Sequence, residues 1–130
     1  MNNFYLWLVE DDLIFKSIFE QQLYTIDKSI ELVFFENAEL ALNKLTTNKE
    51  SKLPHLIFLD LEMPYMDGFQ FLESLQKSFL DTKLEICVIT SSIDSKDFKR
   101  VMQTGLVKKY LVKPLKIDQI KEVLKSISHN

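Results

Sequence analysis

The chain has 130 residues, 46% of them hydrophobic, and a net charge of −3, which fits one domain with a real core and excludes a disordered tail. Its apolar runs are short and broken by charge, and no basic region precedes the first of them, so we expect neither a membrane span nor a secretory signal. The single cysteine, Cys87, excludes an intrachain disulfide and, in its apolar run, predicts a buried thiol in a cytoplasmic protein.

Charge is distributed unevenly along the chain. Residues 1–95 carry 7 basic and 16 acidic residues, a balance of −9, whereas residues 96–130 carry 9 basic and 3 acidic residues, a balance of +6. The basic flank is compatible with a separate partner, but also with lysines that only solvate two amphipathic helices. No helix-turn-helix or other reader follows it, so it does not predict nucleic-acid binding.

Five short apolar runs predict strands, and segments of helical period lie between and after them. Asp12, Asn37 and Asp94 stand where helix N-caps are expected. The predicted strands are 4–9, 30–35, 55–60, 85–90 and 109–112. The predicted helical stripes are Ile14 and Ile18 with Phe15, Phe19 and Leu23; Ala38, Ala41, Leu42 and Leu45; Phe69, Leu72, Leu75 and Phe79; Phe98, Val101 and Met102; and Ile117, Ile120, Leu124 and Ile127.

This alternation predicts an α/β fold with a parallel sheet that helices cover on both faces. We see no internal repeat, linker or low-complexity segment, so we expect residues 1–130 to form one domain without an attached output domain. In open parallel sheets, ligands bind beyond the carboxyl ends of the strands. The residues that follow each predicted strand are therefore the candidates for a functional site.

Polar groups stand at the ends of four of the five predicted strands. Carboxylates brought together at one edge repel each other, by about 4 kcal/mol per pair at 4 Å and an effective dielectric near 20. Such a site must take up protons or hold a hard cation, and carboxylate and carbonyl oxygens suit Mg²⁺. The groups are Glu10, Asp11 and Asp12 after the first strand, Asp60 in the third, Thr90 and Ser91 in the fourth, and Lys113 after the fifth.

A plain cation site does not explain the lysine and the hydroxyl. Lys113 and Thr90 suit an anion with several oxygens, and phosphoryl transfer needs a nucleophile, a metal and such donors. Asp60 can serve as the nucleophile and carry an aspartyl phosphate. Taken singly, each group has an ordinary alternative as a helix start, a turn or a strand exit. Their joint occurrence at successive strand ends favours the functional interpretation.

Four segments resemble the receiver domain of two-component response regulators: LVEDD, LIFLDLEMPYMDG, VITSS and YLVKPL, in this order and spacing. The resemblance covers essentially the whole chain and implies a flavodoxin-like (βα)5 fold with strand order 2-1-3-4-5, known from the chemotaxis member of the family. It implies a stand-alone phosphoacceptor rather than an enzyme, which assists its own phosphorylation and dephosphorylation. A sensor histidine kinase or histidine phosphotransfer protein would phosphorylate it, and a separate protein would read the signal, without a membrane partner.

The resemblance also implies the roles of the acidic residues. Asp60 corresponds to the phosphoacceptor. Asp11 corresponds to a direct Mg²⁺ ligand, with Glu10 acting through water and the backbone carbonyl of Glu62 completing the metal shell. Asp12 falls one place after the acidic pair, and we interpret it as an N-cap.

Three further residues correspond to the groups that sense the phosphoryl group. Thr90 and Lys113 would contact it, and Tyr110 would change rotamer as Thr90 moves. The signal would then appear on the fourth helix, fifth strand and fifth helix. The Lys113–Pro114 bond is expected to be cis, as in the family.

The loops around the site combine family features with departures. Pro64, Asp67 and Gly68 are expected to shape the turn after Asp60. Glu62 and Ser92 occupy positions that tune the lifetime of the phosphoryl group in the family, and the sequence does not decide in which direction. Family members usually carry Gly-Ala before the switch aromatic, where this chain has Leu106 and Val107 with Gly105 one place earlier, so we expect a differently shaped loop.

Three other functions compete with this interpretation. A small aspartate-nucleophile phosphatase of the haloacid dehalogenase type also has an acid two residues after its nucleophile, as Glu62 follows Asp60, but that nucleophile lies on the first strand. A flavodoxin-like FMN carrier is disfavoured because the acids would repel the FMN phosphate and no phosphate-cradling loop is present. A receiver fold that only binds partners is disfavoured by the intact set of site residues.

Overall fold

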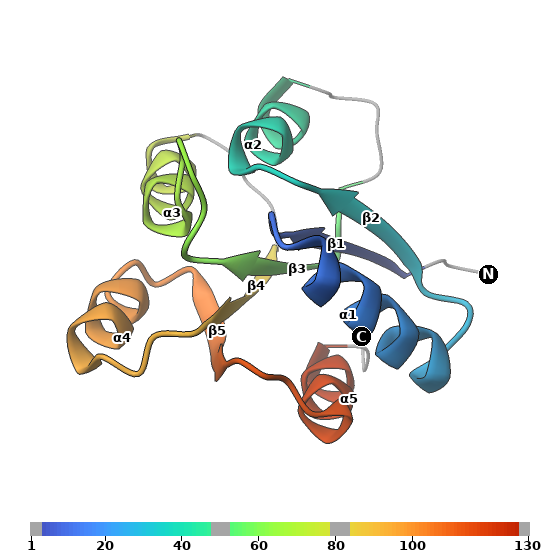
Figure 1. Ribbon diagram of the computed structural model, residues 1–130. Helices are drawn as coiled ribbons and strands as arrows, with labels where there is room; N and C mark the ends of the chain where they lie inside the picture. The colour runs from blue at the N-terminus through green and yellow to red at the C-terminus, as the bar shows by residue number, and fades with distance from the viewer. Residues whose placement is uncertain (1–3, 48–52, 79–83, 128–130) are drawn as a thin grey trace.

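The computed structural model describes residues 4–47, 53–78 and 84–127, in which five strands and five helices alternate (Figure 1). All five strands and helices expected from the sequence are present. The fifth strand begins two residues earlier than predicted, and Phe79 of the third predicted stripe lies outside the described residues. The elements are β1 (Tyr5–Val9), α1 (Leu13–Ile26), β2 (Glu31–Phe35), α2 (Ala38–Thr47), β3 (Leu56–Asp60), α3 (Gly68–Lys77), β4 (Glu85–Thr90), α4 (Ser95–Met102), β5 (Val107–Val112) and α5 (Ile117–Ile127).

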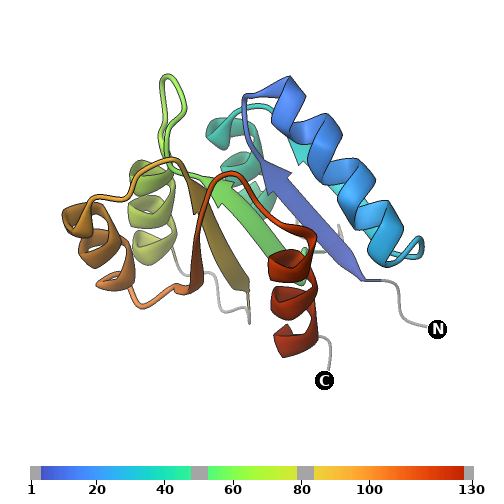
Figure 2. The ribbon, with the colours of Figure 1, turned by 60° about the horizontal axis from the view of Figure 1, so that its bottom comes forward.

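The strands form one parallel sheet in the order β2-β1-β3-β4-β5, as the family resemblance implied. Helices α1 and α5 cover one face, and α2, α3 and α4 cover the other (Figures 1 and 2). The register pairs Val9 with Leu59 and Asp60 with Ile89. The carboxyl ends of β1, β3 and β4 therefore meet at one edge of the sheet.

The sheet separates two apolar cores because successive strand residues point to opposite faces. β3 is the middle strand, and all five of its residues are buried. Trp7 faces the core under α2 and α3, where its ring lies 4.5 Å from that of Phe35. Phe19 of α1 meets Phe58 edge-on in the other core, at 4.9 Å.

Two predicted apolar stripes are only partly buried. Ile14 and Ile18 are 74% and 53% exposed, so the expectation that they face the core is wrong. Apolar residues on α1 span more than one side of the helix, and the sheet takes the side of Phe19 and Leu23. On α4, Phe98 and Met102 are also exposed and Val101 alone is buried, whereas the stripes of α2 and α5 face the cores.

The predicted caps and the predicted buried thiol are confirmed. Asp12 Oδ1 accepts from the backbone N–H groups of residues 14 and 15, Asp94 caps α4, and Asn37 Oδ1 accepts from Leu40 N at 2.8 Å. Cys87 is 1% exposed, and burial raises its pKa to about 12. Within residues 4–47, 53–78 and 84–127, no helix has the length and apolarity that a membrane crossing requires.

Candidate functional site

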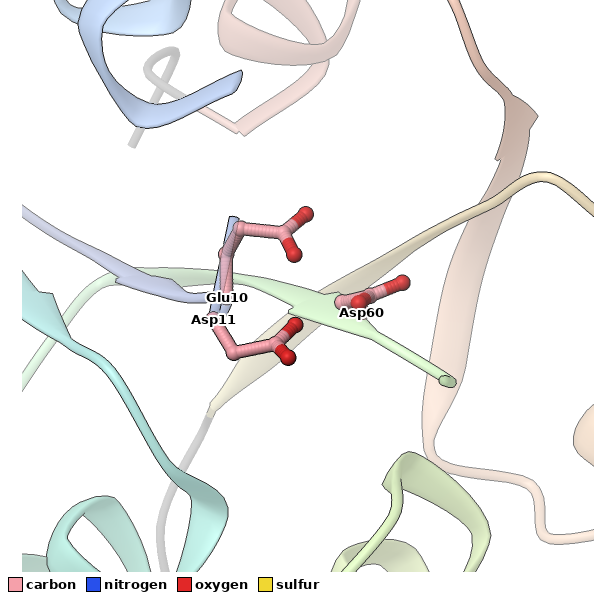
Figure 3. Close-up of side chains that lie close together, drawn as sticks. All are labelled: Glu10, Asp11 and Asp60. Atoms are coloured by element: carbon pink, nitrogen blue, oxygen red, sulfur yellow. The ribbon is translucent and has the colours of Figure 1, made fainter. Parts of the chain in front are cut away.

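Three carboxylates gather at the carboxyl edge of the sheet. Glu10 and Asp11 follow β1, and Asp60 ends β3, which pairs with β1 in parallel. One carboxylate oxygen from each lies within 4.8 Å of the other two, and Figure 3 shows both β1 carboxylates on the side of Asp60. Glu10 and Asp60 are 0% and 2% exposed, whereas Asp11 faces solvent. The predicted acidic cluster is therefore present, and it is open to solvent on the side of Asp11, from which a ligand can reach it.

Lys113 supplies the positive charge of the site. Its backbone N–H donates to the Thr90 carbonyl at 2.7 Å, which ties the residue after β5 to the end of β4. Its ammonium donates to Glu10 Oε1 at 2.6 Å and forms an ion pair with Asp60 Oδ1 at 3.5 Å. The Phe15 ring lies 4.6 Å from Nζ and was not anticipated as a neighbour of the site. The bond to Pro114 is cis, as expected.

The acids outnumber the cations around Asp60. Burial, the charge of Glu10 and hydrogen bonding with its carboxyl raise the pKa of Asp60 to about 8, against the lowering effects of Lys113 and the backbone N–H of Glu62. Burial alone would lower the pKa of Lys113, but the Glu10 hydrogen bond and the charges of both acids raise it overall. Asp60 Oδ1 is the buried side-chain oxygen that lacks a hydrogen-bond partner in the described part of the chain.

These features fit a hard cation. An orphaned buried oxygen, a raised carboxyl pKa and three converging carboxylates indicate that the site lacks positive charge. Carboxylate oxygens are ligands that Mg²⁺ accepts while it keeps several waters. Asp11, being exposed, can bind such an ion without losing an internal contact.

Thr90 and Tyr110 meet at the loop between β4 and α4. Thr90 is fully buried, and its Oγ1 accepts from the Ser92 N–H at 3.0 Å. The Tyr110 hydroxyl donates to the Ser92 carbonyl at 3.4 Å, and its ring meets Phe98 edge-on at 5.2 Å. Glu62 extends from the β3 end to the same loop, where its carboxylate accepts from Ser91 N at 3.4 Å. Both predicted switch residues, Thr90 at the end of β4 and Tyr110 in β5, thus contact the backbone of Ser92 in this loop.

The turn after Asp60 depends on Gly68. A Cβ there would lie 2.6 Å from the Asp60 carbonyl oxygen and 2.7 Å from Leu61 Cα, so any larger residue would push α3 away from the end of β3. Asp67 caps α3 and shares a capping box with Gln70. Tyr65 in this turn has a φ of 69° and is 92% exposed. The sequence predicts a turn here but not this left-handed backbone conformation.

The segment before Tyr110 is where the chain departs from the usual Gly-Ala pattern. Gly105 adopts a φ of +72° after α4, and Val107 is already the first, buried residue of β5. The register between β4 and β5 shifts at Ile86/Cys87, close to this entry. Tyr110 nevertheless keeps its place beside the β4–α4 loop.

Comparison with known proteins gives a family. A model of the response regulator receiver domain matches residues 6–125. The chain belongs to the response regulator receiver family. Receiver domains are in general non-enzymatic phosphoacceptors that interact with histidine kinases or phosphotransfer proteins, and they typically bind Mg²⁺ at an acidic cluster.

Individual relatives agree with this assignment. The chain is 35% identical over 71 residues to the probable C4-dicarboxylate response regulator DctR of Halalkalibacterium halodurans, covering 55% of this chain and 30% of that protein. It is 28% identical over 126 residues to the hybrid signal transduction histidine kinase L of Dictyostelium discoideum, covering 95% of this chain and 7% of the kinase. A two component response regulator from Cytophaga hutchinsonii has the same fold, with a TM-score of 0.87, 20% identity and complete coverage of both chains. The chain spans less than a third of the length of DctR and of kinase L.

Proposed function

We propose that this receiver accepts a phosphoryl group on Asp60 from a histidine-phosphorylated kinase or phosphotransfer protein, with Mg²⁺ as cofactor. The observation that carries the proposal is the buried Asp60, whose Oδ1 has no hydrogen bond and lies 3.5 Å from the Lys113 ammonium. Asp60 and Asp11 would bind the ion directly, Glu10 through water, and Glu62 through its backbone carbonyl. Bound Mg²⁺ would neutralise carboxylate and phosphoryl charge.

The transfer step exchanges one bond for another. A carboxylate oxygen of Asp60 attacks the phosphorus, a P–O bond forms, and the P–N bond of the phosphohistidine breaks. The electron pair leaves with the imidazole nitrogen, which then takes up a proton. Asp60 must be ionised to attack, and Lys113 supports that form because its charge lowers the pKa of Asp60.

The phosphorylated aspartate would then reorganise its neighbours. Its dianion would attract Lys113 and the hydroxyl of Thr90, which in the unphosphorylated structure accepts from Ser92 N. Hydrogen bonds to charged groups contribute roughly 1.5–3 kcal/mol each. Two or three such hydrogen bonds together approach the ~5.5 kcal/mol that moves a two-state equilibrium from 1:99 to 99:1. We place the resulting signal on α4, β5 and α5, where Tyr110 and much of the basic flank lie.

Labelling by acetyl phosphate tests this assignment. Wild-type protein with Mg²⁺ should incorporate one phosphoryl group, and Asp60→Asn or a chelator should abolish incorporation. Asp12→Asn is the matched control and should be labelled like the wild-type protein. It removes the charge of Asp12, the exposed acid next to Asp11, while asparagine can still cap α1. Full labelling of the Asp60→Asn variant would refute the acceptor, and rapid turnover of a small phosphate ester would support the phosphatase alternative.

A further inference from the structure

The hydroxyl of Thr90 faces its own loop rather than the acceptor. Thr90 follows Ile89, the β4 residue that pairs with Asp60, so the two side chains end neighbouring strands. Yet Thr90 Oγ1 accepts from the Ser92 N–H at 3.0 Å, and Asp60 Oδ1 remains without a hydrogen bond. A turn of the Thr90 side chain toward Asp60 would therefore lengthen or break the hydrogen bond from the Ser92 N–H.

Ser92 is held from the other side by the first turn of α4. Its hydroxyl donates to Asp97 Oδ2 at 2.6 Å and accepts from Asp94 N at 3.1 Å. A short bond to a carboxylate is among the stronger hydrogen bonds in proteins. Ser92 and Asp97 are both partly buried, which limits competition from water. The hydroxyl thus fixes the loop to α4.

The carbonyl of Ser92 makes the third connection. It accepts from the Tyr110 hydroxyl at 3.4 Å, and the Tyr110 ring packs edge-on against Phe98 of α4. We call this set, Thr90, Ser92, Asp94, Asp97 and Tyr110, the Ser92 junction. It joins the end of β4, the start of α4 and the middle of β5 through one residue.

We infer that Asp97 is a positioning residue that, by accepting the Ser92 hydroxyl, holds Thr90 in the resting arrangement and opposes its turn toward Asp60. The inference rests on the proposed function and extends it to a residue that lies outside the acceptor pocket. Breaking the Ser92–Asp97 bond removes a restraint on the loop but leaves Asp60, Lys113 and the acidic cluster intact. A variant that lacks the Asp97 carboxylate should therefore be phosphorylated faster than the wild-type protein.

The test combines a measurement on the unphosphorylated protein with one on the reaction. In Asp97→Ala, the Ser92 amide should exchange with solvent on the order of tenfold faster, and acetyl phosphate with Mg²⁺ should phosphorylate the variant on the order of tenfold faster. Asp118→Ala is the matched control, because it removes an exposed acid from the first turn of α5, and both rates should stay at the wild-type value.

Variants of Ser92 guard against a simple folding defect. Ser92→Ala keeps the Asp97 charge at the start of α4 and should raise the amide exchange and phosphorylation rates as Asp97→Ala does. Ser92→Thr keeps a hydroxyl and should leave both rates close to the wild-type values. Faster amide exchange with an unchanged phosphorylation rate would overturn the inference by making the bond merely structural. Unchanged exchange in both alanine variants would also overturn it. If wild-type protein is not labelled at all, the proposed function fails, and the exchange measurement still decides whether Asp97 restrains the loop.

Discussion

Helices α3 and α4 lie next to each other on one face of the sheet but are anchored differently (Figure 1). Helix α3 buries Gly68, Phe71, Leu72 and Leu75, and its first residue lies against Asp60 and Leu61 at the end of β3. Helix α4 has eight residues and buries Val101 alone. Helix α3 is therefore built into the core, whereas α4, which contributes Asp97 to the Ser92 junction, packs on the core through Val101.

Charged and polar side chains link α3 to α4 and to the turn that follows α4. The Arg100 guanidinium lies 4.1 Å from the Phe69 ring centre and 3.4 Å from Glu73, and Gln76 donates to the Thr104 carbonyl at 2.9 Å. Exposed ion pairs contribute only about 0–1 kcal/mol. Regions with few buried apolar contacts open at lower free energy than the core. We therefore expect α4 to open at a lower free energy than α3.

The largest expected effect comes from removing the apolar anchor of α3. Phe71→Ala should lower the free energy of unfolding by about 3–5 kcal/mol, because its ring is fully buried. Phe98→Ala on α4, where the side chain is 46% exposed, should cost under about 1.5 kcal/mol. Urea unfolding followed by circular dichroism measures both. Equal losses would contradict the contrast between the helices.

Glycine replacements test the same contrast in the backbone. Gly68→Ala should cost about 1–3 kcal/mol, because its Cβ would collide with the backbone of Asp60 and Leu61. Gly105→Ala, which follows α4, meets open space and should cost only about 1 kcal/mol, from its positive φ. Denaturation midpoints of the two variants decide the order. A smaller loss for Gly68→Ala would mean that α3 can shift freely.

The stability of the protein should also depend on pH through Asp60, because its surroundings raise the pKa of its carboxyl. The pKa of Asp60 is raised in the folded protein, so the folded state keeps a proton that the unfolded state loses above its ordinary value of 3.8. Stability of the metal-free protein should therefore fall as the pH rises from about 4 to about 8. Asp60→Asn removes this loss and should be more stable than wild type by roughly 1–3 kcal/mol near pH 8, with little difference near pH 4. Thermal unfolding of both proteins between about pH 4 and pH 8, in the presence of a chelator, measures this difference in stability. Added Mg²⁺ should reduce the difference, because it stabilises the ionised Asp60 of the wild-type protein.

The smallest effect concerns the link between the two helices. Arg100→Gln should change global stability by less than about 1 kcal/mol, because the pair with Glu73 is exposed. It should nevertheless speed amide exchange in α4 relative to α3, since the ring contact with Phe69 is also lost. Lys96→Gln, elsewhere on α4, is the control. Equal exchange in wild type and Arg100→Gln would show that this link does not restrain α4.

The sequence predicted the site better than the surfaces around it. Asp60 and Lys113 follow apolar runs, and a parallel sheet brings all strand ends to one edge, so their proximity depends on topology alone. Ile14 and Ile18 were misjudged because periodicity finds a stripe without saying which side the sheet will cover. Asp97 was missed because its contact with Ser92 depends on rotamers and loop shape that no local pattern encodes.

The placement of Trp7 has a practical consequence. It is the one tryptophan of the chain, and it lies buried in β1, separated from β5 by two strands of the sheet. Its fluorescence should change when the apolar core beneath α2 and α3 unfolds, but not when the conformation changes only around α4. An optical assay of signalling would need a dye or a second indole introduced on α4 itself.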